Sequence, residues 1–157
     1  RGYLQRAAVA RARIDVADGQ RAANVAQDFL LQLLPIDAQR MIRWRRISES
    51  AAAQCGRATL PAISEPKTFR DIIDQRQDAY GILCAVDPQN PLLDQIVPER
   101  GRHSSVLLLI GPEGDFAPEE VALANARGFH SASLGRMVLR SDTAAVAALS
   151  ILQHALI

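Results

Sequence analysis

A short apolar run that breaks at a glycine- and proline-containing bend constrains this fold more than any other feature. Residues 106–110 read Val-Leu-Leu-Leu-Ile, and Gly-Pro-Glu-Gly follows at 111–114. An apolar run of this length, bounded by such a cluster, is typical of a buried strand that ends in a loop. The sequence therefore predicts a buried strand with a glycine loop at its carboxyl end.

A helix is expected after this loop. Pro118 suits the first helical position, where its missing N–H costs nothing. Glu119 and Glu120 fall in the first turn, where the helix dipole favours negative charge. Gly128 is placed to end the helix as a C-terminal cap.

The same order then repeats towards the C-terminus. We expect a short strand at 131–134, a loop from Gly135 to Arg140, and a helix from Asp142 to about Leu156 with Ser141 as its N-cap. In a parallel α/β sheet, the loops that follow strands collect at one edge, where ligands bind. The two glycine loops should therefore share a pocket.

These two loops resemble a known signature. GPEGDF at 111–116 and LGRMVLRSDTAAVAAL at 134–149 are similar to the C-terminal motifs of the SPOUT-class methyltransferases. The strongest likeness is to the bacterial family that methylates N3 of one uridine in 16S ribosomal RNA. This chain departs from the family pattern at Asp115, where a second glycine is usual, at Arg136-Met137, which stands for Pro-Arg, and at 141–143, where Ser-Asp-Thr stands for Thr-Glu-Thr.

A third segment, RWRRISESAAAQCGR at 43–57, resembles a helix of the same family. From Ile36 onwards we expect a helix with an apolar stripe through Trp44, Ile47 and Ala51, continued by Ala52 and Cys55, and arginines on its other face. The candidate RNA-binding residues are Arg43, Arg46 and Arg57, with phosphate as their target. The alternative is that the charged face of this helix is merely solvated.

The resemblance implies a parallel sheet flanked by helices, a C-terminal deep trefoil knot, a homodimer, and S-adenosylmethionine as cofactor. The expected cofactor-binding residues are Gly111, Gly114, Leu134, Gly135, Val138, Leu139 and Thr143. Glycines permit close backbone approach to a flat adenine, and apolar side chains supply pocket walls. The alternative is that the glycines serve only as turn residues.

The implied reaction is methylation of uridine N3 in small-subunit ribosomal RNA. N3 is protonated near neutral pH, so the site must accept its proton or stabilise the resulting anion. Arg140 is the main candidate for stabilising that anion, and Glu113 and Asp142 are candidate proton acceptors. Arg140 could instead form a salt bridge to either acid. Ribose 2′-O methylation and a catalytically weak RNA-binding dimer are the competing functions.

The remaining segments carry weaker signals. We assign 36–157 to the methyltransferase domain and leave 1–35 as a possible remnant of, or linker from, an RNA-binding domain. Residues 9–16 suggest a strand, and 29–34 suggest either a strand or a helix end. Further strands are expected at 60–63 and 81–86, a helix after the N-cap Thr68, and one or two helical turns within 92–97.

Composition limits the function classes. The chain has 157 residues and a net charge of +1, so it can form a domain with a core but carries no overall field towards nucleic acid. Its apolar runs fall short of the roughly 20 residues that span a membrane. Cys55 and Cys84 lack metal-like spacing, and we expect both to be buried and reduced. A cytoplasmic protein without a bound metal is the expectation.

Overall fold

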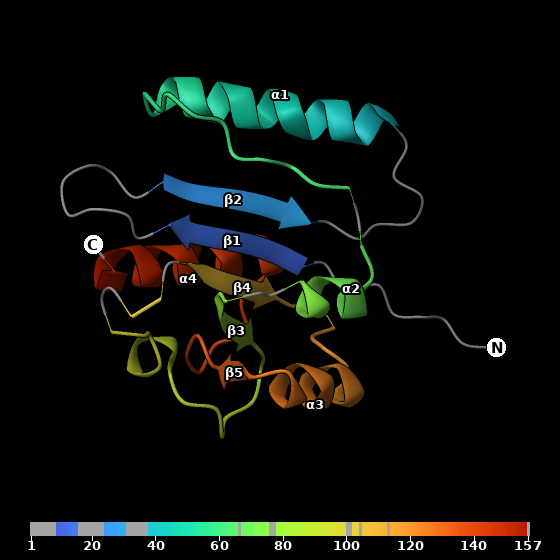
Figure 1. Cartoon of the computed structure of the whole chain (residues 1–157), viewed down its shortest axis with the longest axis vertical. Helices are drawn as coiled ribbons and strands as arrows, with labels where there is room; N and C mark the ends of the chain where they lie inside the picture. The colour runs from blue at the N-terminus through green and yellow to red at the C-terminus, as the bar shows by residue number, and fades with distance from the viewer. Residues whose placement is uncertain are drawn as a thin grey trace.

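The computed structural model describes residues 9–15, 24–30, 38–65, 67–75, 78–99, 102–103, 105–112 and 114–156. In chain order its elements are β1 (Val9–Asp15), β2 (Asn24–Leu30), α1 (Ala38–Gln54), α2 (Phe69–Asp74), β3 (Tyr80–Cys84), the 3₁₀ turn η1 (Leu93–Gln95), β4 (Val106–Ile110), α3 (Pro118–Ala126), β5 (Phe129–Ala132) and α4 (Ser141–Leu156) (Figure 1).

The strands form one mixed sheet in the order β2-β1-β4-β3-β5. β3 lies between β4 and β5 and runs parallel to both. β1 pairs antiparallel with both β2 and β4. The predicted α/β class is confirmed for the three-stranded parallel part, whereas the first two strands make the sheet as a whole mixed.

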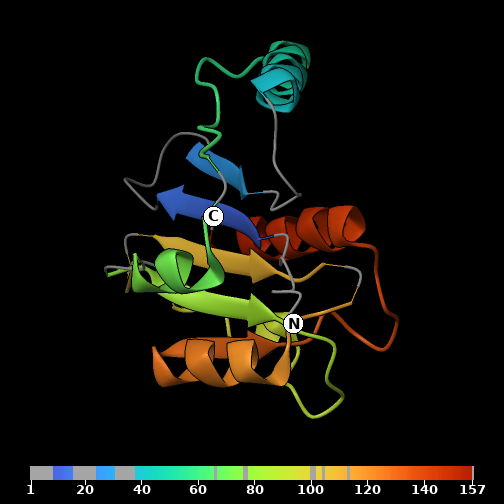
Figure 2. The ribbon, with the colours of Figure 1, turned by 90° about the vertical axis from the view of Figure 1, so that its right-hand side faces the viewer.

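Helices cover both faces of the parallel part (Figure 2). Along β4, Val106, Leu108 and Ile110 join a core with α4 and η1, and Leu107 and Leu109 join a second core with α2 and α3. Successive side chains of a strand point to opposite faces, so each residue of β4 enters one of the two cores. All five are buried for this reason, as is usual for a strand covered on both sides.

Several local predictions are confirmed. α3 begins at Pro118, and Gly128 follows its end with a positive φ of 77°. Thr68 caps α2, because its side-chain oxygen accepts a hydrogen bond from the backbone N–H of Asp71. The strand near residue 9 and the strand interpretation of Phe29 are also confirmed, whereas 31–35 lie outside the described residues.

Other predictions were wrong. Residues 60–63 form no strand; Pro61 has no N–H to donate to a ladder, and Leu60 is 56% exposed. β5 begins at Phe129 rather than Ser131, because Phe129 pairs with Gly81 and packs in the core. Cys84 is buried as expected, but Cys55 is exposed.

Helix α1 lies beyond the β2 edge of the sheet, away from α2, α3 and α4 (Figures 1 and 2). Between residues 41 and 54, where burial is described, the buried residues of α1 are Met41 and Ala52, whereas Ile47 is 55% exposed. The predicted apolar stripe through Ile47 and Ala51 therefore does not face a core. In the described residues, no helix combines the length and apolarity that a bilayer crossing requires.

Candidate cofactor site

A cavity of about 370 Å³ lies at the carboxyl ends of β3, β4 and β5. Three loops and the first turns of α4 form its walls, so both predicted glycine loops meet there. The lining residues are Cys84, Ala85, Val86, Ile110, Gly111, Pro112, Gly114, Asp115, Ser133, Leu134, Gly135, Met137, Val138, Leu139, Ser141 and Ala144. Of the predicted cofactor residues, all but Thr143 are among them.

The glycines of this cavity serve different purposes. A Cβ added to Gly114 or Gly135 would meet no atom within 4 Å, so at these positions the space beside the backbone is open. Gly135 also has a φ of 120°, which other residues rarely adopt. A Cβ on Gly111 would instead lie 2.8 Å from Oδ1 of Asp115. A glycine is therefore needed at 111 because the Asp115 side chain occupies the space of a Cβ, whereas the space beside Gly114 and Gly135 is empty.

Asp115 connects two of the loops. Its Oδ2 accepts a hydrogen bond of 2.7 Å from the backbone N–H of Val86, which follows β3. Asp115 is the one non-glycine residue with positive φ among the described residues, at 59°. A side chain in this left-handed region is uncommon, although aspartate tolerates it better than most residues do.

Two serines supply polar groups to an otherwise mostly apolar wall. The Ser133 hydroxyl donates to the Gly135 carbonyl and accepts from the Gly135 N–H, both at 3.2 Å, and so shapes the second glycine loop. Ser141 Oγ is buried and has no hydrogen-bond partner within the described part of the chain. An unsatisfied buried hydroxyl is costly, which makes Ser141 a candidate for a hydrogen bond to a bound ligand.

The Cys84 thiol is part of the same wall. Burial, and secondly the negative charge of Asp115, raise the pKa of Cys84 to about 12. The thiol therefore stays protonated near neutral pH, and it acts as a small apolar surface rather than as a nucleophile.

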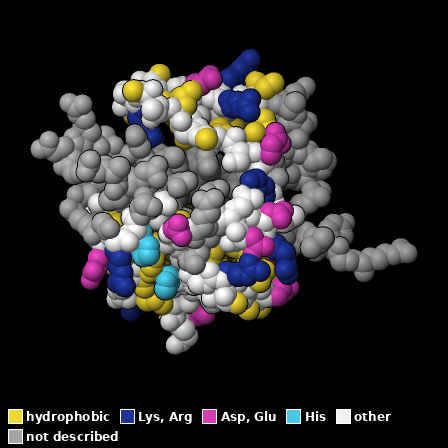
Figure 3. Space-filling view, viewed as in Figure 1, with side chains coloured by type: hydrophobic (Ala, Val, Ile, Leu, Met, Phe, Trp, Pro, Cys, Tyr) yellow, Lys and Arg dark blue, Asp and Glu magenta, His cyan; other side chains and the backbone are white. Residues whose placement is uncertain are grey.

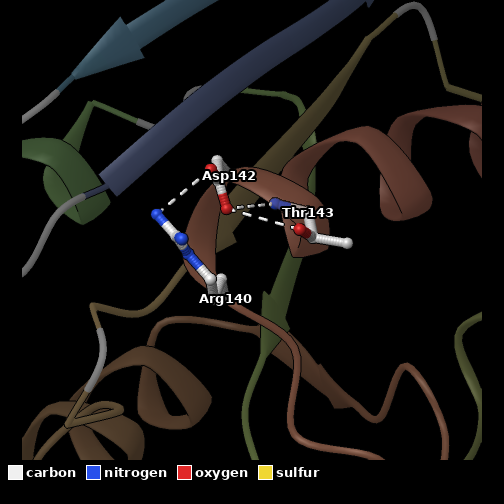
Figure 4. Close-up of polar contacts among 3 residues, drawn as sticks. All are labelled: Arg140, Asp142 and Thr143. Atoms are coloured by element: carbon white, nitrogen blue, oxygen red, sulfur yellow. Dashed lines mark hydrogen bonds and ion pairs between the residues drawn. The ribbon is translucent and has the colours of Figure 1, made fainter.

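The three residues predicted at the start of the last helix do not line the cavity. Arg140 pairs with Asp142 at 3.6 Å, and their side chains are 80% and 70% exposed (Figure 4). Oδ1 of Asp142 accepts hydrogen bonds from both the N–H and the hydroxyl of Thr143. The salt bridge considered as an alternative for Arg140 is thus present, while Glu113 lies outside the described residues.

A second concavity runs along α1. Its lining residues are Ile42, Arg43, Arg46, Ile47, Ser50, Ala51 and Gln54, around a volume of about 640 Å³. Arginines and apolar residues therefore share one face, contrary to the predicted separation, and Figure 3 shows both kinds together over α1. Arg57 lies beyond the helix end and does not line this groove.

Sequence reasoning missed Val86, Ser133 and Ser141 as parts of the cavity. Loops that follow parallel strands collect at one edge of the sheet, which also holds for the loop after β3, but no local signal indicated which of its atoms would face the cavity. Within the described ranges, no group of three or more His, Cys, Asp or Glu side chains is arranged to hold a metal ion.

The fold and the cavity define a class of protein: an α/β domain with a cavity at the carboxyl edge of its parallel strands. Residues 31–153 match the model of the RNA methyltransferase domain, and the chain belongs to that family. The resemblance noted in the sequence is thereby confirmed.

Particular relatives are bacterial. The chain is 32% identical, over 75% of its length and 40% of the relative's, to ribosomal RNA small subunit methyltransferase E of Synechocystis. The enzyme of that name from Bacillus subtilis is 27% identical over 71% of the chain and 46% of the relative. The chain thus spans less than half the length of these curated relatives.

Solved structures agree with this family. Ribosomal RNA small subunit methyltransferase E from Neisseria gonorrhoeae, bound to S-adenosyl methionine, has a TM-score of 0.69 at 27% identity, covering 80% of this chain and 52% of that one. A Legionella pneumophila protein with bound SAM has a TM-score of 0.68 at 35% identity, covering 80% and 51%.

Proposed function

We propose that this chain is the cofactor-binding part of an S-adenosylmethionine-dependent enzyme that methylates N3 of a uridine in small-subunit ribosomal RNA. The observation that carries the proposal is the meeting of both glycine loops, 111–115 and 133–139, in one cavity at the strand ends. The two solved relatives with bound S-adenosylmethionine support the choice of cofactor. The names of the curated relatives support ribosomal RNA as substrate.

The residues present fit such a cofactor. The open space at Gly114 and Gly135 admits a flat ring against the backbone, and Leu134, Val138 and Leu139 supply apolar contact. Ser141 lines the cavity, and its Oγ, which has no hydrogen-bond partner among the described residues, would reach the cofactor after a rotation of the side chain. When bound, S-adenosylmethionine supplies an electrophilic methyl group.

The protein's own side chains accept the N3 proton of the uridine and stabilise the anion that results. Arg140 stabilises the anion that forms when N3 loses its proton, because a guanidinium pairs well with the uracil oxygens. Asp142 and Glu113 are the candidate proton acceptors. Only a swing of the Arg140 side chain away from Asp142 frees it for this role, and an exposed ion pair is weak enough to allow that.

RNA contact is assigned to the groove on α1, where Arg43 and Arg46 lie beside apolar side chains. Arg57 at the end of the helix extends this basic surface. Such a surface suits phosphates with bases stacked or packed nearby. We place the enzyme in the cytoplasm, where its substrate is made.

We further propose a homodimer and a C-terminal knot. Val146 on α4 is 65% exposed, and Met137 and Val138 at the cavity rim are 77% and 71% exposed, which suits an apolar contact with a second copy. Sedimentation should give a dimer, and Val146→Glu should give a monomer, whereas Gln153→Glu on the exposed surface of α4 should leave the dimer intact.

The knot is tested by unfolding single molecules that are held and pulled at their two termini. The extended chain should be shorter than a fully extended unknotted chain of the same length, because the tightened knot retains some residues.

The decisive assay has two stages. Calorimetry with S-adenosylmethionine should give saturable binding, and absence of binding would favour the catalytically weak RNA-binding dimer. Incubation with undermethylated small-subunit RNA, followed by nuclease digestion and mass spectrometry, should then locate a methyl on uracil N3. A methyl on the ribose would instead support 2′-O transfer.

A further inference from the structure

The cavity contains one charged wall group. Among the described residues that line it, Asp115 is the single one with a charged side chain. Within the described residues, Arg127 pairs with Asp74 and Arg140 pairs with Asp142, and neither of these pairs includes Asp115. Arg140 also lies outside the lining.

The position of Asp115 is maintained against a backbone preference. Its φ of 59° falls in the region where glycine is favoured, yet the position carries a carboxylate. The hydrogen bond from Val86 holds one oxygen, Oδ2, at the junction of two loops. The other oxygen, Oδ1, occupies the space where a side chain on Gly111, another residue of the cavity wall, would lie. Strain of this kind persists where the surrounding structure holds it, and it often coincides with ligand sites.

The Asp115 carboxylate also affects the electrostatics of the cavity. The Asp115 charge contributes to the raised pKa of Cys84, although burial contributes more. A negative charge that destabilises a neighbouring anion stabilises a neighbouring cation by the same Coulomb interaction. That interaction extends over several ångströms, so it needs no direct contact with the ligand.

We infer that Asp115 is a specificity-determining residue that makes this cavity prefer the positively charged methyl donor, S-adenosylmethionine, over its neutral-sulfur product, S-adenosylhomocysteine. This inference rests on the proposed function. The two ligands share adenosine and the amino-acid end, and they differ in the methyl group and the sulfonium charge. A preference for the donor limits inhibition by accumulated product.

The test compares Kd values by calorimetry for S-adenosylmethionine, S-adenosylhomocysteine and sinefungin, an analogue with an amine in place of the sulfonium. Asp115→Asn keeps an oxygen that can accept from Val86 N–H but removes the charge. The ratio of product Kd to donor Kd should fall about fivefold or more in this variant, as removal of a partly screened charge predicts. Sinefungin should lose affinity along with the donor.

The matched control is Asp87→Asn. Asp87 is exposed on the loop after β3, accepts a hydrogen bond from Gln89 N–H, and does not line the cavity. The Asp87→Asn variant should leave the ratio of product Kd to donor Kd unchanged. Adenosine should bind with equal affinity to the unmodified protein and to both variants.

Two results would overturn the inference. An unchanged ratio in Asp115→Asn would show that the charge does not discriminate. A parallel loss of affinity for donor and product would assign Asp115 to the amino-acid end that both share. If the unmodified protein binds none of the ligands, the proposed function itself fails, which is a distinguishable outcome.

Discussion

Asp115 and Val86 lie 29 residues apart in sequence, and the 2.7 Å hydrogen bond from Val86 N–H to Asp115 Oδ2 joins the loops that follow β3 and β4. The same carboxylate fills the space beside Gly111. One side chain therefore holds two walls of the cavity at a fixed separation.

The first prediction concerns Gly111. Gly111→Ala places a Cβ 2.8 Å from Asp115 Oδ1 and 3.3 Å from the Asp115 backbone, so a shift is unavoidable. We expect the free energy of unfolding in urea to fall by about 1–3 kcal/mol, as overpacking does. In an Asp115→Gly background, Gly111→Ala should lower the free energy of unfolding by less, because Asp115 Oδ1, the atom nearest to the added Cβ, is absent. Gly114→Ala, where an added Cβ meets nothing, is the control. Equal costs in the two backgrounds would contradict the contact.

A second prediction concerns the unpartnered hydroxyl. Ser141→Ala should leave the stability of the ligand-free protein unchanged or raised, since it removes a buried unsatisfied group. Cofactor affinity should fall about two- to tenfold, because a hydrogen bond contributes roughly 0.5–1.5 kcal/mol net. Ser150→Ala, on the exposed side of the same helix, is the control: it should neither raise the stability nor lower the cofactor affinity. Unaltered cofactor affinity in Ser141→Ala would remove this residue from the site.

The third prediction separates binding from chemistry. Arg140→Ala should preserve both stability and cofactor affinity, since its exposed ion pair with Asp142 contributes little. Methyl transfer should fall about 100-fold, the typical loss of one anion-stabilising donor. Arg136→Ala changes an exposed arginine of the same loop and should keep most activity. Full turnover in Arg140→Ala would refute the proposed role.

A fourth prediction concerns RNA affinity. Removing both Arg43 and Arg46 should weaken binding to ribosomal RNA and reduce the slope of log K against log salt by roughly 0.7–0.9 per lost phosphate contact. Arg45→Ala removes an exposed arginine of α1 that does not line the groove. A drop of the same size in that variant would mean that general charge, rather than the groove, attracts RNA.

The fifth prediction concerns the thiols. At pH 8 iodoacetamide should label exposed Cys55 and spare Cys84, whose pKa is raised to about 12. Because Cys84 has an ordinary pKa of 9.0 when unfolded, its contribution to stability is full below pH 9 and is lost as the pH rises towards about 12. Cys84→Ala should therefore flatten that part of the stability profile. Peptide mass spectrometry showing equal labelling of both thiols would contradict the buried position.

Local patterns predicted much of this fold. β4 and α3 follow from an apolar run and from the residues that start and end the helix, and these signals act within a few residues. The last helix was also predicted, but its N-cap was wrong: α4 begins at Ser141, whose Oγ makes no hydrogen bond within the described residues, and the Arg140 carbonyl accepts from Ala144 N–H. The glycines at 111, 114 and 135 reach the cavity because parallel strands end at one edge. Their contact with a cofactor stays a prediction.

What the sequence could not predict depends on distant partners. The face of α1 that is covered depends on which segments pack beside it, so the outward orientation of Ile47 was not visible in the periodicity. The Asp115–Val86 bond joins residues with no shared local pattern. Likewise, the spacing around Arg140 placed it beside the cavity but did not give the direction of its side chain.

A structure of the protein crystallised with S-adenosylmethionine tests the central claim most directly. The account predicts cofactor density between the loops at 111–115 and 133–139, within hydrogen-bond distance of Ser141 Oγ. Density elsewhere on the molecule, or an empty cavity at saturating cofactor, would contradict it.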